Sequence, residues 1–202
     1  MGTLRRLFGP SRREIWQQLS ADIQGRYVSS FWTGDKVHGT HGEWTVTLDT
    51  YVVSTGKTYI TFTRMRAPYV NPGGFRFTIY RKSIFSGIAT MLGMQDIEIG
   101  DPEFDEAFVI KGTDERPVKA LFANPHIREL MEQQRNIHLT VKDDEGWFGA
   151  SFPDGVDELY FAVPGVIRDL DRLKLLYELF AEVLEQLCAT GSAYERDPRV
   201  QL

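Results

Sequence analysis

Two histidines, His38 and His41, lie three residues apart in a glycine-containing stretch and form the only closely paired imidazoles of the sequence. With Asp35 or Glu43 they could supply three ligands, and a zinc site uses three or four such ligands at fixed distances. The glycines favour a loop over residues 33–42, and two exposed loop histidines explain the motif more simply. We therefore expect neither a bound metal nor another cofactor.

A second group with chemical potential is the acidic segment 98–106, which holds five carboxylates. Paired carboxylates can act as general acid and base, so this segment and the His38/His41 loop together define one hypothesis, a metal-dependent or acid–base hydrolase. The segment lacks the ligand spacing and the central glycine of a calcium loop. Proximity in sequence does not place two carboxylates across a cleft, and a structural role is the alternative.

That structural role is ion pairing between the acidic segment and three arginines of the first half. Arg64 and Arg66 continue the alternation of Ile60 and Phe62, which should direct them to the core side of a strand. A buried guanidinium needs a partner. The candidate partner or ligand contacts are therefore Arg64, Arg66, Arg76, Asp101 and Asp105.

Common catalytic motifs are missing from the sequence. There is no G-x-S-x-G serine motif and no G-x-G-x-x-G motif. The run Gly56-Lys57-Thr58 lacks the upstream glycine of a phosphate-binding loop. We accordingly favour a non-enzymatic binding or scaffold domain over the hydrolase.

Charge divides the chain into two unlike halves. Residues 1–94 carry 12 basic and 5 acidic side chains, whereas residues 95–202 carry 11 basic and 23 acidic ones. The halves could attract each other within one fold, or the basic half could meet an anionic partner. A peripheral membrane or anionic-ligand binder acting through the basic half is thus a third hypothesis. A protein partner or a small anionic ligand fits the sequence, and we see no specific signal for nucleic acid.

The first half predicts a helix followed by strands. Ser11 and Glu14 have capping-box spacing at the start of a helix over residues 11–24. Alternating polar and apolar residues predict strands at 27–32, 44–53, 58–66 and 75–82. The last three should form an antiparallel meander whose buried face carries Trp44, Val46, Ile60, Phe62, Phe75 and Phe77.

The second half repeats this order. A short apolar helix over 84–92 and an irregular connection over 95–107 lead to a strand at 108–111. Two short helices begin near Pro117 and Pro125, and strands follow at 137–142, 147–152 and 159–163. The i, i+3, i+4 pattern from Ile167 to Leu187 predicts a long final helix.

These elements indicate an α+β fold with antiparallel sheet built from two three-strand meanders, packed by helices and closed by a long C-terminal helix. We expect a single domain over 1–202, with two structurally similar halves, about 11–93 and 108–190, as a further possibility. Apolar runs are too short for a membrane-spanning helix. One cysteine and no signal peptide favour the cytoplasm.

One stretch shows a resemblance to known proteins. It is Asp101-Pro102-Glu103-Phe104-Asp105-Glu106-Ala107-Phe108-Val109-Ile110-Lys111, followed by Asp114, Val118, Leu121 and residues 127–130. The region 98–133 resembles bacterial proteins of unknown function in which an F-D-x-x-F motif precedes a strand and a short helix, often after a membrane anchor. The resemblance implies an uncharacterised protein and carries over no catalytic residue; we expect no such anchor in this chain.

The N-terminal leader is basic and apolar, with Leu4, Leu7 and Phe8 among Arg5 and Arg6. It could lie on an anionic membrane, where each basic residue near the surface contributes about 1 kcal/mol. Alternatively, Gly9-Pro10 turns the leader back so that Leu7 and Phe8 pack against the first helix. We favour this second arrangement, which predicts weak or no membrane contact through the leader.

Overall fold

The computed structural model describes residues 9–32, 34–84, 93–143, 152–200 and 202. In these residues, nine strands form one antiparallel sheet in the order β1-β2-β3-β4-β9-β8-β5-β7-β6. Their bounds are β1 Arg26–Ser30, β2 Gly34–His41, β3 Trp44–Ser54, β4 Tyr59–Val70, β5 Phe77–Arg81, β6 Gln95–Asp96, β7 Phe108–Gly112, β8 His138–Lys142 and β9 Val156–Pro164.

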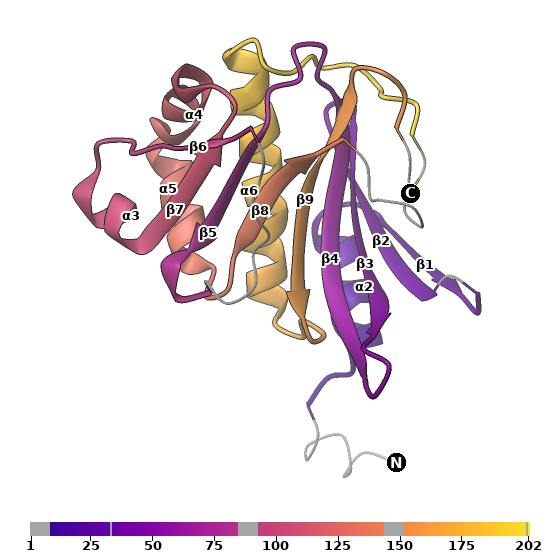
Figure 1. The fold of residues 1–202 in the computed structure, drawn as a ribbon. Helices are drawn as coiled ribbons and strands as arrows, with labels where there is room; N and C mark the ends of the chain where they lie inside the picture. Colours follow the sequence, from indigo (N-terminus) through magenta and orange to yellow (C-terminus); the bar gives the residue numbers. More distant parts are fainter. Residues whose placement is uncertain (1–8, 33, 85–92, 144–151, 201) are drawn as a thin grey trace.

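The helices cover one face of this sheet, as Figure 1 shows for α2, α4, α5 and α6. Their bounds are α2 Arg12–Asp22, α3 Pro102–Ala107, α4 Glu115–Phe122, α5 Pro125–Gln133 and α6 Leu170–Ala189, with a short 3-10 helix at Lys82–Ile84. The expected α+β class, the antiparallel sheet and the long C-terminal helix are confirmed.

Local sequence signals place the helix starts. The Ser11 hydroxyl accepts from the Glu14 amide, and the Glu14 carboxylate accepts from the Ser11 amide, which confirms the capping box. Asn124 caps α5 and Asp169 caps α6 in the same way, each satisfying an amide that the helix leaves without a partner. Short polar residues thus set the helix boundaries close to their expected positions.

The core lies between the sheet and the helices. One row of side chains in register crosses six neighbouring strands and is buried throughout: Leu48, Met65, Phe161, Leu139, Ile79 and Ile110. Helix α6 closes over this layer with fully buried residues that include Leu176 and Phe180. Its apolar stripe follows from the 3.6-residue period in the sequence.

The first meander differs from the expected one in its last strand. Strands β1 to β4 follow one another in the sheet, but β5 pairs with β7 and β8 instead of β4. The position beside β4 belongs to β9, which pairs with Thr63–Val70 over eight residues. The turn at 71–74 therefore leads the chain across two strands and does not close a hairpin.

The buried face of β4 is also the opposite of the expected one. Met65, Ala67 and Tyr69 face the helices, whereas Ile60 is 39% exposed and Phe62 is partly exposed on the other face. The apolar residues of this strand move from one face (Ile60, Phe62) to the other (Met65, Ala67, Tyr69). The first residues lie at a hairpin end, where neither face is buried. Trp44, Val46, Phe75 and Phe77 are buried as expected.

Three further expectations concern single segments. Residues 34–41 form strand β2 and not a loop, and the connection 95–107 contains β6 and helix α3, whose cap is Asp101. The helix expected at 84–92 and the strand expected at 147–152 fall almost entirely outside the described residues, as does the leader over residues 1–8. The division into similar halves stays a prediction.

Candidate functional site

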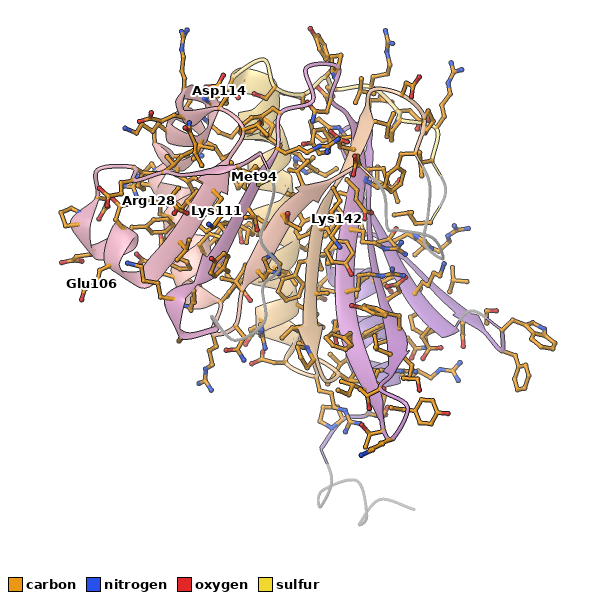
Figure 2. The ribbon with its side chains drawn as sticks, viewed as in Figure 1. Met94, Glu106, Lys111, Asp114, Arg128 and Lys142 are labelled. Atoms are coloured by element: carbon orange, nitrogen blue, oxygen red, sulfur yellow. The ribbon has the colours of Figure 1, made fainter. Side chains whose placement is uncertain are left out.

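The face of the sheet opposite the described helices, called the helix-free face below because none of the described helices lies on it, is polar. One register position away from the core row, the side chains across the strands are His38, Thr47, Arg66, Tyr160, Thr140, Thr78 and Lys111. Figure 2 shows Lys111 and Lys142 on this face. A shift of one residue thus exchanges an apolar row for a polar one, as the two-residue period of a strand requires.

A carboxylate shared by two arginines lies in the β3–β4 part of this face. The Arg64 Nε and Nη2 atoms donate to the two oxygens of Asp49 at 2.8 and 2.9 Å, and Arg66 Nη2 donates to Oδ2 at 2.6 Å. Burial opposes ionisation of Asp49, but the hydrogen bond from Arg64 and the charges of both arginines hold its pKa below the usual value. Asp49 and Arg66 are each nearly inaccessible to solvent.

Aromatic rings extend this cluster across the sheet toward β8. The Arg64 guanidinium lies 5.0 Å from the Tyr51 ring centre, and Tyr51 stacks on Phe62 at 5.1 Å. The Lys142 ammonium lies 3.4 Å from the ring centre of Tyr160. Cations held over ring faces in this way are stabilised by the ring quadrupole, so this part of the face is a preorganised, partly dry surface.

A cavity of about 740 Å³ opens on the same face at the β1–β3 end. Its lining comes from the strands and from the C-terminal tail: Gln24, Gly25, Arg26, His38, Thr40, Thr45, Thr47, Pro68, Val200 and Leu202. Arg26, His38, Thr45 and Thr47 share the helix-free face because of their pairing register. The side chains that converge here are hydroxyls, an imidazole and a guanidinium, with an aliphatic wall from the tail.

The electrostatic field around His38 is positive. Burial comes first in lowering the pKa of His38, and the charges of Arg26, Lys36 and Arg66 lower it further, against the opposing charge of Asp49. Within the described part of the chain, neither Arg26 nor Lys36 forms an ion pair. His38 Nδ1 shares a 3.0 Å hydrogen bond with the Thr47 hydroxyl. The cavity therefore offers donors and uncompensated positive charge.

The structure divides the five candidate contacts that sequence reasoning grouped together. Arg64 and Arg66 contact Asp49 and lie on the helix-free face, not in the core. Arg76 instead pairs with Asp143 at 2.9 Å and lies 3.7 Å from Asp157. The expected pairing of these arginines with the acidic segment is wrong, because the segment lies near the far edge of the sheet (Figure 1).

The two acidic candidates have local roles. Asp101 caps α3 and lies 3.4 Å from Arg128 Nε. Asp105 accepts hydrogen bonds from the amides of Ile99 and Gly100 at 3.0 and 2.9 Å. Carboxylates engaged with a helix start and a turn stabilise the local backbone, so these two residues hold the α3 region together.

The histidine pair is separated as well. His38 lies on the helix-free face, whereas His41 is on the helix side, 2.6 Å from Glu185 of α6 and stacked on Trp44. The acidic segment follows β6, the edge strand at the other end of the strand order from β1 and β2. Among the described residues, no group of three or more His, Cys, Asp and Glu side chains could hold a metal ion. The geometry thus does not assemble the site that the hydrolase hypothesis requires.

Sequence reasoning missed Arg26 and Lys36. Arg26 begins the edge strand β1 and Lys36 lies within β2, neither with a motif around it, and only the strand arrangement brings both beside His38. The excess of basic residues in the first half was the available signal, and it did not identify which residues meet.

Comparisons with known proteins place few constraints on this chain. No protein-family model matches it, and no curated protein matches it. A solved structure similar to it is that of the mycobacterial trehalose monomycolate transport factor A, TtfA, with 9% identity and a TM-score of 0.45. That match covers 94% of this chain and 99% of TtfA, and at such similarity it establishes no shared function. In the described residues, none of the helices is long and apolar enough to cross a membrane.

Proposed function

We propose that this protein is a non-enzymatic binding protein whose helix-free face takes a small anionic ligand, one that carries a phosphate or carboxylate group. The observation that carries the proposal is the cavity at the β1–β3 end: Arg26 in its lining, and Lys36 near His38, bring positive charge without a carboxylate partner among the described residues. An anion would supply the missing countercharge.

The donors in the cavity fit such a group. Thr40 and Thr45 present hydroxyls, and His38 keeps its Nε2 edge free of hydrogen bonds to described residues because Thr47 engages Nδ1. Charge-assisted hydrogen bonds from a guanidinium to an anionic oxygen are about twice as strong as neutral ones. The buried Asp49–Arg64–Arg66 cluster lies beside the cavity, and its Asp49 and Arg66 charges act on the pKa of His38 in opposite directions.

Thermal unfolding with and without sulfate tests the proposal. Sulfate is a divalent tetrahedral anion, and chloride at equal ionic strength is the reference. A ligand at 100 times its Kd stabilises the folded state by about 2.7 kcal/mol, so the melting temperature should rise in sulfate by several degrees. The Arg26→Gln/Lys36→Gln double variant should lose this rise.

Arg116→Gln is the matched control, because Arg116 is an exposed arginine on α4 with no described ion-pair partner. Its response to sulfate should equal that of the parent protein. An equal response in the parent, the double variant and the control would show a general salt effect and would contradict a site at β1–β3.

A further inference from the structure

Most of the large apolar side chains that are exposed in the described residues lie on two hairpin ends. Phe31 and Trp32, in the β1–β2 turn, are 94% and 90% exposed, and Tyr59, beside the β3–β4 turn, is 79% exposed. Val52 is 58% exposed on the same hairpin. Large apolar groups held this far out in water have no role in the core, and such exposure marks an interaction surface.

Both hairpin ends lie at one end of the molecule. Ser30 pairs with Gly34 and Ser54 pairs with Tyr59, whereas the intervening β2–β3 turn follows His41 at the other end. Figure 1 shows the β1–β2 tip projecting at the right and the β3–β4 tip at the bottom, both away from the upper end of these strands. This surface, defined by Phe31, Trp32, Val52, Tyr59 and their turns, is called the hairpin edge.

Basic side chains accompany the hairpin edge. Gly165 bonds to Thr61 and bridges to Phe62 of β4, which places the β9–α6 connection beside the hairpin. Arg168 in that connection lines a cavity with Arg135. In the described residues, neither these two arginines nor Lys57 in the β3–β4 turn forms an ion pair. Asp169 and Asp171 also lie here, and Asp169 is engaged as the cap of α6.

We propose that the hairpin edge docks on an anionic membrane surface, with the aromatic tips entering the headgroup region. Tryptophan and tyrosine favour this region because one part of each ring is apolar and another is polar. The apolar residues occupy two projecting tips, whereas a protein partner would require a continuous surface of about 800 Å² on each side. The surrounding cations complement anionic lipid headgroups.

The start of the chain adds to this arrangement. Gly9 and Pro10 line a cavity with Ile15, Arg168 and Leu170, next to the β9–α6 connection. From the leader alone, the sequence predicts weak or no membrane contact.

Co-sedimentation with vesicles tests the proposal, using the full chain and vesicles of phosphatidylcholine with or without phosphatidylglycerol. The parent protein should bind the anionic vesicles, and Phe31→Ser/Trp32→Ser should lower the partition coefficient by about tenfold or more. Because both residues are exposed, the double variant should fold, which circular dichroism and thermal unfolding can verify. Tyr194→Ser is the matched control: Tyr194 is 56% exposed but lies beside Val70, at the other end of β4.

A second variant separates the hairpins from the leader. Deletion of residues 1–8 should weaken binding but leave it sensitive to Phe31→Ser/Trp32→Ser. Absence of vesicle binding, equal binding by the parent and the double variant, or binding that depends on the leader alone would each overturn the proposal. So would a lipid-free dimer in sedimentation velocity that the double variant dissociates, because a second copy would then cover the hairpin edge.

Discussion

Asp49 forms ion pairs with two guanidinium groups of the helix-free face through one carboxylate. Arg66 is 4% exposed and Asp49 is 3% exposed, so neither has much access to water. Removing one partner of a buried ion pair leaves an uncompensated charge, which costs more than the pair itself contributes.

We therefore predict that Asp49→Asn lowers the free energy of unfolding by about 3 kcal/mol. Asp96→Asn provides the comparison, because Asp96 pairs with Lys111 on the surface, where an ion pair contributes about 1 kcal/mol or less. Urea denaturation of the two variants measures both effects. A loss for Asp49→Asn no larger than that for Asp96→Asn would show that the arginines find other compensation.

His138 links the stability of this face to pH. Burial, followed by the charge of Lys142, lowers the pKa of His138, whose Nε2 shares a 3.0 Å hydrogen bond with the Thr78 hydroxyl. The unfolded chain then takes up a proton near pH 6.5, whereas the folded protein does so only at lower pH. The stability contribution is complete above about pH 6.5 and is lost as the pH falls through the lowered pKa of the folded protein.

We predict that His138→Gln unfolds with a weaker dependence on pH below about 6.5 than the parent protein. Comparing the two proteins cancels the contributions of other groups. One of these is His126, whose pKa is raised by its hydrogen bond to Glu178, so its protonation stabilises the folded protein as the pH falls. Denaturant unfolding at several pH values gives the difference. Parallel pH profiles would contradict a buried neutral imidazole at this position.

At the scale of elements, Gly39 marks the point where β2 meets the helix layer most closely. A Cβ atom at this position would overlap the Tyr177 ring of α6 and come within 2.8 Å of Ile23 Cδ1. The Tyr177 hydroxyl also donates to the Thr40 carbonyl at 3.0 Å, which fixes the ring in this place. Because Gly39 has no side chain, β2 can pack closely against α6 and against Ile23 at the end of α2.

We predict that Gly39→Ala destabilises the protein by about 1–3 kcal/mol, the usual cost of overpacking. Tyr177→Ala should remove most of this penalty, so the double variant should be more stable than additivity predicts. A thermodynamic cycle of the four proteins measures the coupling. Additive effects would indicate that the backbone of β2 moves away from the helices.

Elements with local signals were predictable from the sequence. The capping box at Ser11, the caps at Asn124 and Asp169 and the apolar stripe of α6 each depend on residues a few positions apart. Pairings between distant segments were not predictable in this way. Nothing near β4 indicates that β9 lies beside it, and the phase change between Phe62 and Met65 becomes clear only from the pairing.

The candidate site shows the same division. The sequence identified Arg64 and Arg66 as sharing a face with Ile60 and Phe62, and their register is correct. The sequence predicted that this face is buried, because Ile60 and Phe62 are apolar. A face that carries both apolar and basic residues cannot be assigned to the core or to the helix-free side from the sequence pattern alone. Asp49, Arg26 and Lys36 carried no motif, and only the folded sheet brings them beside these arginines and His38.

At the scale of the whole molecule, the basic first half does not pair wholly with the acidic second half. Arg76 pairs with Asp143 and Asp157, whereas Arg64 and Arg66 contact Asp49 of their own half. Among the described basic residues of the first half, Arg26, Lys36 and Lys57 form no ion pair. We infer that, when the hairpin edge contacts a membrane, the ligand cavity lies toward the end of the molecule that points away from the lipid.

The central claim, that the cavity takes an anion, is tested most directly by the ring resonances of His38 in a pH titration by NMR. A bound sulfate stabilises the protonated imidazole, so the pKa of His38 should rise in sulfate relative to chloride at equal ionic strength. His126, on α5 and far from the cavity, serves as the internal reference. A rise confined to His38 and absent from Arg26→Gln/Lys36→Gln is the predicted result, whereas an unchanged His38, or equal shifts of both histidines, would contradict the account.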